Sequence, residues 1–113
     1  MSFEELGAFM VAYDIDVANC SEKELNTHVT KFGRGFAQAG GVQAAVVNAV
    51  GNKYTTEHIE GLDKKNQALL KTMPKKPVAQ FVEVMACDGG CINGPCSLAP
   101  LTLAKRQMKK VLD

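Results

Sequence analysis

The sequence lacks an excess of charge of either sign, because 13 Lys and Arg residues face 12 Asp and Glu residues. Without a broad electrostatic field, binding to nucleic acid or to an anionic membrane surface is not expected. The sequence also lacks any apolar run near the length of about 18 residues that a membrane span requires. Acidic Glu4 and Glu5 stand at the start, where a secretory signal peptide would be basic. We therefore expect a cytoplasmic protein that has neither nucleic acid nor a membrane as a partner.

No internal repeat, low-complexity tract or obvious linker divides the 113 residues. Hydrophobic residues make up 46% of the sequence and charged residues 22%, which is the balance of a folded globular protein. A chain of this length builds one modest core and is too short for two. We expect a single domain over residues 1–113.

Two capping boxes predict helices in the first third of the chain. In this motif a serine and a glutamate three residues later satisfy each other's backbone amides. Ser2 and Glu5 begin an amphipathic helix over residues 3–13. Ser21 and Glu24 begin a short helical segment that two glycines interrupt after residue 32.

The middle of the chain reads as a helix followed by a strand. Residues 42–50 are rich in Ala and Val and almost free of charge, which predicts a buried helix that Gly51 ends. Tyr, Thr and Ile alternate in part over residues 54–59 and favour a short strand, after which Gly61 turns the chain.

The last third repeats the alternation of helix and strand. Asp63 begins a helix that ends near Met73, before the next prolines. Residues 78–85 have the composition of a largely buried strand, and Pro100 suits the first turn of a closing helix to Leu112. The fold class is therefore α/β, with a small, mainly parallel sheet flanked by helices.

A cluster of cysteines lies between that strand and the closing helix. Cys87, Cys91 and Cys96 fall within ten residues. Thiolates brought together on one turn suit an iron–sulfur cluster or zinc, since both prefer sulfur ligands. Gly89 and Gly90 allow the tight loop that brings Cys87 and Cys91 to one metal centre.

Two other interpretations of the same residues stay open. Buried free cysteines and glycine-rich turns occur in many proteins that bind no metal. A zinc site would need a fourth ligand, for which only His28 and His58 are candidates, and a lone histidine is more often structural. The sequence is thus compatible with a metal-free or zinc-binding interaction domain.

The residues around the cysteines also resemble a known family. Phe-Val-Glu-Val-Met-Ala-Cys-Asp-Gly-Gly-Cys-Ile-Asn-Gly, from Phe81 to Gly94, is very similar to the last cysteine motif of iron-only hydrogenases. That motif reads Glu-Val-Met-Ala-Cys-Pro-Gly-Gly-Cys-Ile-Asn-Gly-Gly-Gly-Gln-Pro. Upstream, Gly40, Gly41 and Val42 are similar to the family's Gly-Gly-Val helix start. The resemblance covers residues 32–96 and implies the C-terminal lobe of a hydrogenase catalytic domain.

The resemblance implies roles for three residues of the motif. Cys87 would bind a [4Fe-4S] cubane, and Cys91 would bind it too while its sulfur bridges to a two-iron subsite. Met85 would line the cofactor pocket, although a core methionine at the end of a strand is an equally good interpretation. The cofactor is expected only in the complete protein and not in the isolated chain.

Departures from the family pattern limit what this chain does alone. The family's other cluster cysteines belong to motifs near Thr-Ser-Cys-Cys-Pro and Met-Pro-Cys, and neither motif occurs in the 113 residues. Asp88 replaces the motif's proline, and Pro95, Cys96 and Ser97 replace Gly-Gly-Gln. Such changes are similar to those of divergent, hydrogen-sensing relatives. The chain alone should not make or oxidise hydrogen.

These observations give one leading hypothesis. We expect an iron–sulfur half-site, meaning a loop that supplies part of a cluster's ligands, from a hydrogenase-like redox or sensor protein. Cys96 is a candidate for a third ligand, whereas Cys20 matches nothing in the motif and reads as a structural thiol. The partner is the remainder of the hydrogenase-like protein or a separate lobe. A lobe of this kind should expose an apolar face near the cysteine loop, through which it could also self-associate.

Overall fold

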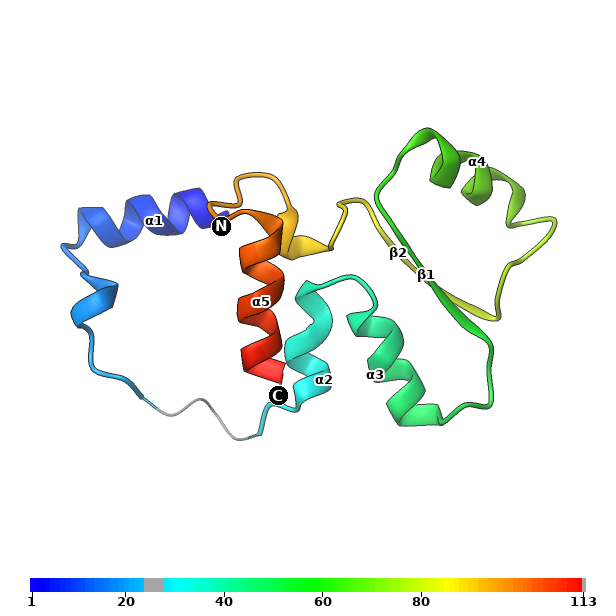
Figure 1. The fold of residues 1–113 in the computed structure, drawn as a ribbon, viewed down its shortest axis with the longest axis horizontal. Helices are drawn as coiled ribbons and strands as arrows, with labels where there is room; N and C mark the ends of the chain where they lie inside the picture. The colour runs from blue at the N-terminus through cyan, green and yellow to red at the C-terminus, as the bar shows by residue number, and fades with distance from the viewer. Residues whose placement is uncertain (24–27, 113) are drawn as a thin grey trace.

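A computed structural model describes residues 1–23 and 28–112 of the chain (Figure 1). This part contains five α-helices and a sheet of two parallel strands, which confirms the expected α/β class. The helices are α1 (Phe3–Ala12), α2 (Lys31–Arg34), α3 (Gly41–Val50), α4 (Lys64–Thr72) and α5 (Leu101–Leu112). The strands are β1 (Thr56–Glu60) and β2 (Phe81–Met85), and single 3₁₀ turns occupy Val17–Asn19, Gly35–Ala37 and Cys91–Asn93. No helix among the described residues is long and apolar enough to cross a membrane.

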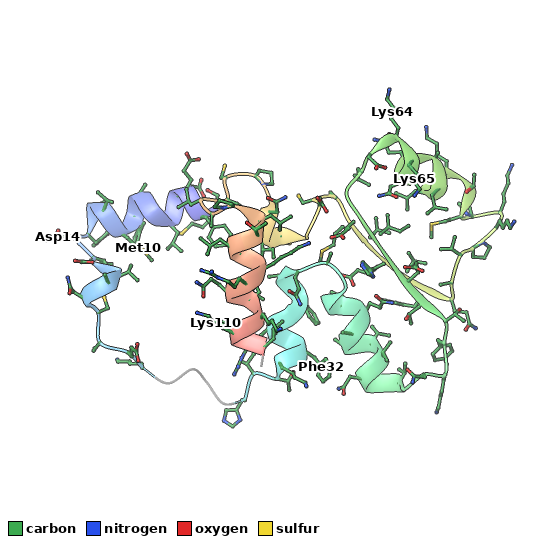
Figure 2. All side chains as sticks on the ribbon, viewed as in Figure 1. Met10, Asp14, Phe32, Lys64, Lys65 and Lys110 are labelled. Carbon is green, nitrogen blue, oxygen red and sulfur yellow. The ribbon has the colours of Figure 1, made fainter. Side chains whose placement is uncertain are left out.

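The elements form a row rather than a closed layer. Figure 1 shows α5, α2 and α3 side by side, with the sheet beyond α3 and with α1 projecting from the other end. The molecule extends over 54 × 32 × 21 Å. In Figure 2, Met10 and Asp14 lie at one end of this row, and Lys64 and Lys65 lie at the other.

The sheet is built by a β1–α4–β2 unit. The strands pair in parallel from Thr56 opposite Phe81 to Glu60 opposite Met85. Because side chains alternate along a strand, His58 and Glu60 share one face with Glu83 and Met85. Helix α3 packs against both strands.

The second strand is shorter and less buried than expected. Residues 78–80 lie outside β2, which begins at Phe81. Gln80 and Thr55 hydrogen-bond to each other through side-chain and backbone atoms just before the parallel ladder begins. Val84 is exposed, and the buried residue of β2 is the charged Glu83. A sheet of only two strands leaves part of each strand uncovered, so the prediction of a largely buried strand was wrong.

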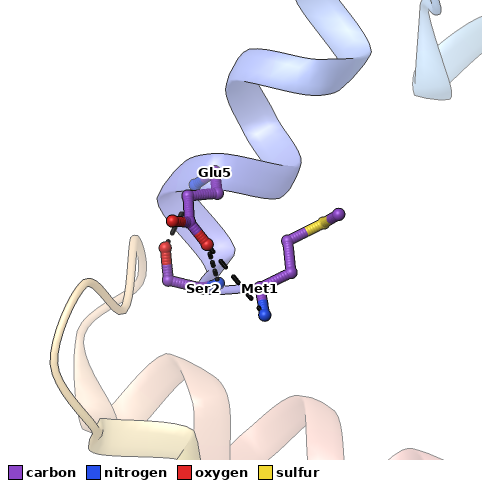
Figure 3. Close-up of polar contacts among 3 residues, drawn as sticks. All are labelled: Met1, Ser2 and Glu5. Carbon is purple, nitrogen blue, oxygen red and sulfur yellow. Dashed lines mark hydrogen bonds and ion pairs between the residues drawn. The ribbon is translucent and has the colours of Figure 1, made fainter.

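The first helix begins with the predicted capping box. The Ser2 hydroxyl accepts a hydrogen bond from the Glu5 amide at 3.1 Å, and the Ser2 amide donates to Glu5 Oε2 at 2.7 Å (Figure 3). The N-terminal ammonium group lies 4.0 Å from the same carboxylate. Helix α1 buries none of its residues, so its start is fixed locally rather than by packing.

The second helix differs from the expectation. The predicted partner of Ser21, Glu24, lies outside the described residues. Helix α2 begins only after Thr30, whose hydroxyl accepts a hydrogen bond from the Gly33 amide at 3.2 Å. Gly33 therefore lies within the first turn of the helix instead of interrupting it.

Helix α3 ends at Gly51, as predicted, but it is not buried. Gly41 is its one buried residue, and its last three residues are exposed. Helix α3 contacts α2 on one side and the sheet on another, and these contacts leave most of its side chains half-buried or exposed. Two further helix starts agree closely with the prediction: Asp63 caps α4 through the Asn66 amide, and α5 begins one residue after Pro100.

Candidate functional site

The cysteine loop, residues 86–97, connects β2 to the segment before α5 and contains two tight turns. In the first, the Gly90 amide donates to the Cys87 carbonyl at 3.1 Å, and Gly89 has φ +81°. Asp88 lies outside the positive-φ region, so the turn is type II, in which the third position favours glycine. The second turn has the same form, with the Ser97 amide donating to the Gly94 carbonyl at 3.2 Å.

Three hydrogen bonds attach the first turn to the rest of the molecule. The Gly89 amide donates to Glu60 Oε2 at 2.8 Å, and the Gly89 carbonyl accepts from the Ala39 amide at 3.2 Å. The Asn93 side chain donates to the Asp88 carbonyl at 2.9 Å. Gly89 and Gly90 are both buried. The turn is therefore fixed from β1, from the segment before α3 and from its own C-terminal side.

Cys87 and Cys91 line the same pocket, which has a volume of about 370 Å³. Cys87 is half-buried and Cys91 is exposed. The first residues of α1 form the opposite wall, with Phe3 and Leu6 among the lining side chains, and Gly94 and Pro95 complete it. Figure 1 shows the N-terminal end of α1 beside the loop that leads into α5. Two thiols facing a mainly apolar pocket are a suitable donor pair for a soft metal centre.

The other predicted ligands lie outside this pocket. Cys96 is exposed and, like the half-buried Met85, does not line the pocket. Across residues 1–23 and 28–112, no three side chains of His, Cys, Asp or Glu form a group that could hold a metal ion. The described residues thus bring Cys87 and Cys91 to one pocket, and a ligand role for Cys96 stays a prediction.

Neither histidine joins the two thiols at their pocket. His58 lies on β1, where its Nδ1 is 3.0 Å from Gln43 Oε1, and His28 does not line the pocket. Cys20 follows the first 3₁₀ turn and donates its thiol to the Asp16 carbonyl at 3.3 Å. These residues have local partners or positions that agree with structural roles.

A pair of carboxylates that the sequence did not suggest as functional lies on the sheet face that meets α3. Glu83 is 6% exposed, and its Oε2 accepts a hydrogen bond from the Gln43 amide at 2.9 Å, in the first turn of α3. Its Oε1 is buried and has no partner among the described residues. Glu60 lies on the same face and holds the Gly89 amide. The signal was a glutamate in the middle of an apolar strand, because burying a carboxylate is costly unless it is bonded.

Replacing Cys96 with glycine should stabilise the chain by about 0.5–1 kcal/mol. Cys96 has φ +62° and occupies the third position of a type II turn, where a Cβ is unfavourable and glycine is preferred. Urea unfolding of Cys96→Gly checks the change in free energy of unfolding. Cys96→Ala is the matched control, since it removes the thiol but keeps the Cβ. Equal stabilisation by both variants would show that the thiol, not the backbone, is the source.

Comparison with known proteins identifies the family to which most of this chain, including Cys87 and Cys91, is similar. The family model described as "Iron only hydrogenase large subunit, C-terminal domain" matches residues 1–95. The match therefore starts at α1, well before residue 32, where the resemblance was expected to begin, and stops before Cys96 and α5. Iron hydrogenase 1 of Clostridium pasteurianum is 36% identical to this chain over 73 residues. The aligned region covers 63% of this chain and 13% of that protein, so the chain spans a small part of its relative. The chain belongs to the family of the iron-only hydrogenase large subunit, C-terminal domain.

Proposed function

We propose that this chain supplies half of an iron–sulfur cluster site in an iron-only hydrogenase-like redox or hydrogen-sensing protein. The observation that carries the proposal is the shared pocket of Cys87 and Cys91, on the loop whose sequence matches the family's cysteine motif. In this role Cys87 and Cys91 would both hold the [4Fe-4S] cluster, and Cys91 would also hold a two-iron subsite in the complete protein. When bound, the cluster would supply electron storage for hydrogen chemistry.

The donor set supports a half-site rather than a complete site. A [4Fe-4S] cluster ordinarily takes four cysteine thiolates. The pocket offers Cys87 and Cys91, and Cys96 is at most a third ligand from the same loop. The remaining ligands would come from outside this chain, so we propose that the chain alone does not turn over hydrogen. Met85, the last residue of β2, would line the cofactor pocket in the complete protein.

The exposed surface supports a partner lobe. The chain exposes 8723 Å², whereas a compact monomer of 12.1 kDa exposes about 6,000 Å². Its radius of gyration is 17.2 Å, against about 13 Å for a compact domain of this length. Within the described residues, Ile59 and Ile92 are the only buried hydrophobic side chains. A second lobe that covers the apolar surface would supply the missing core.

The apolar surface includes a groove close to the cysteine loop. The groove has a volume of about 320 Å³ and is lined by Phe3, Ile92, Leu98, Leu103, Met108 and Val111, among others. We propose that the remainder of the hydrogenase-like protein covers this face, and self-association through it is the alternative. The cytoplasmic location expected from the sequence remains a prediction.

Anaerobic reconstitution with iron and sulfide tests the half-site. We expect the purified chain to take up iron with visible charge-transfer absorption, and to lose it in air because the cluster lacks protein ligands. Iron and sulfide are counted per chain before and after exposure to air. A stable, air-resistant cubane would contradict the half-site, since all its ligands would then be present. If the chain takes up no iron, and Cys87→Ser has the same free energy of unfolding as the parent chain, a metal-free interaction domain is favoured. Zinc in the purified protein would instead favour a zinc-binding module.

A further inference from the structure

Glu60 has a position that the cluster ligands alone do not explain. It is the last residue of β1, and its carboxylate accepts a hydrogen bond from the Gly89 amide at 2.8 Å. Gly89 lies midway between Cys87 and Cys91 and is buried. A bond between a carboxylate and a backbone amide is charge-assisted and roughly twice as strong as a neutral one. One side chain from the neighbouring strand therefore holds the centre of the cysteine turn.

Further hydrogen bonds fix Glu60 and its turn. The Asn66 side chain donates to the Glu60 carbonyl at 2.9 Å, which ties the end of β1 to the first turn of α4. The Gly61 amide donates to the Met85 carbonyl at 3.0 Å, which keeps the ends of β1 and β2 together. On the opposite side of the turn, the Gly89 carbonyl accepts from the Ala39 amide. Gly89 is thus held through both its polar backbone groups.

The second carboxylate on this sheet face serves a different segment. Glu83 accepts from the Gln43 amide at 2.9 Å and so fixes the start of α3, not the cysteine loop. Both glutamates lie on the same face of the sheet and each accepts one backbone amide. Glu83 is therefore a natural control for Glu60, with similar chemistry and a different target.

We propose that Glu60 is the positioning residue of the cysteine loop. Its carboxylate holds the Gly89 amide, fixes the type II turn and thereby sets how Cys87 and Cys91 face their shared pocket. It also occupies an amide that would otherwise be free to donate elsewhere. The consequence for iron uptake rests on the function proposed above, whereas the consequence for the turn does not.

Amide hydrogen exchange in the metal-free chain tests the inference directly. In Glu60→Ala, we expect the Gly89 amide to exchange about tenfold to hundredfold faster than in the parent chain, because a hydrogen bond to a charged acceptor is lost. Glu60→Gln keeps a carbonyl acceptor and should restore most of the protection. Glu83→Ala should accelerate the Gln43 amide and leave Gly89 no more affected than the amides of the β1–β2 ladder. Gly89 exchange that is unchanged in Glu60→Ala, or raised equally by both alanine variants, would overturn the proposal.

Iron uptake separates this inference from the proposed function. We expect Glu60→Ala to take up iron several-fold more slowly than the parent chain and Glu60→Gln to recover most of the rate. If Glu60→Ala frees the Gly89 amide but takes up iron like the parent, the turn does not position the thiols and the inference fails. If the parent chain takes up no iron, the proposed function fails, and the exchange of Gly89 alone decides whether Glu60 positions the turn.

Discussion

Replacing Gly90 with alanine should destabilise the chain by about 3 kcal/mol or more. A Cβ on Gly90 would lie 2.6 Å from the Ala39 nitrogen and 2.8 Å from the Gln38 carbonyl carbon. Both are backbone atoms, so no side chain can rotate away to make room. Gly90 also has φ +86°, which strains any residue with a Cβ. Because natural domains are stable by only about 5–15 kcal/mol, the variant should be largely unfolded in mild urea.

Gly51→Ala is the matched control for this prediction. Gly51 has φ +72°, and nothing lies within 4 Å of the position of its Cβ. The two variants restrict the unfolded chain equally and share the backbone strain, so they differ in the clash alone. Gly51→Ala should cost about 1–3 kcal/mol from strain alone, since φ +72° with ψ −173° is a conformation essentially confined to glycine. Urea unfolding followed by circular dichroism measures both, and equal losses would mean that the cysteine loop does not press against residues 38 and 39.

Local sequence signals were enough to predict most elements. The capping box at Ser2, the cap at Asp63 and the glycine after α3 each act through neighbouring residues, and each was found where expected. The alternation of helix and strand also predicted a parallel pair, because a helical crossover returns the second strand in the same direction. These features depend on a few residues in sequence, so one sequence is sufficient to recognise them.

Burial was predicted poorly for a physical reason. An apolar run such as residues 42–50 indicates that its side chains favour burial. It does not indicate whether other residues of this chain bury them. Here the sheet has two strands and most apolar side chains are half-buried or exposed. An apolar run reads the same in a chain that buries its own surface and in one that leaves it exposed. Glu83 left a local signal as a glutamate within an apolar strand, but its partner Gln43 is 40 residues away in the sequence and could not be identified from it.

The candidate site was predicted from the motif, but its surroundings were not. Spacing and resemblance identified Cys87 and Cys91, which the structure brings to one pocket. The apolar wall from α1 comes from the other end of the chain, and Glu60 contacts the loop from 29 residues upstream. Such long-range contacts leave no local pattern. Cys96 shows that closeness in sequence is not enough: it is near the other thiols in the chain, yet it does not line their pocket, and its ligand role stays a prediction.

Replacing either Cys87 or Cys91 with serine should lower iron uptake at least about tenfold, because even the loss of a residue that only supports a metal ligand costs about 10–100-fold. A serine hydroxyl is not the soft thiolate that iron–sulfur clusters require. The pocket is lined by two thiols, so under the proposed function the loss of one would leave too few ligands to retain a cluster. Anaerobic reconstitution followed by iron and sulfide analysis measures the effect.

Cys20→Ser is the matched control for the two ligand variants, since the Cys20 thiol is exposed and lies against the Asp16 carbonyl. It should take up iron like the parent chain.

Cys91 is also exposed, so Cys91→Ser should change the free energy of unfolding by no more than about 0.5 kcal/mol, which excludes unfolding as the cause of lost iron. If Cys91→Ser retains the parent's iron while Cys96→Ala loses it, the cluster is held by a different pair of thiols. Equal, small losses in all these variants would instead mean that iron binds the chain without a defined site.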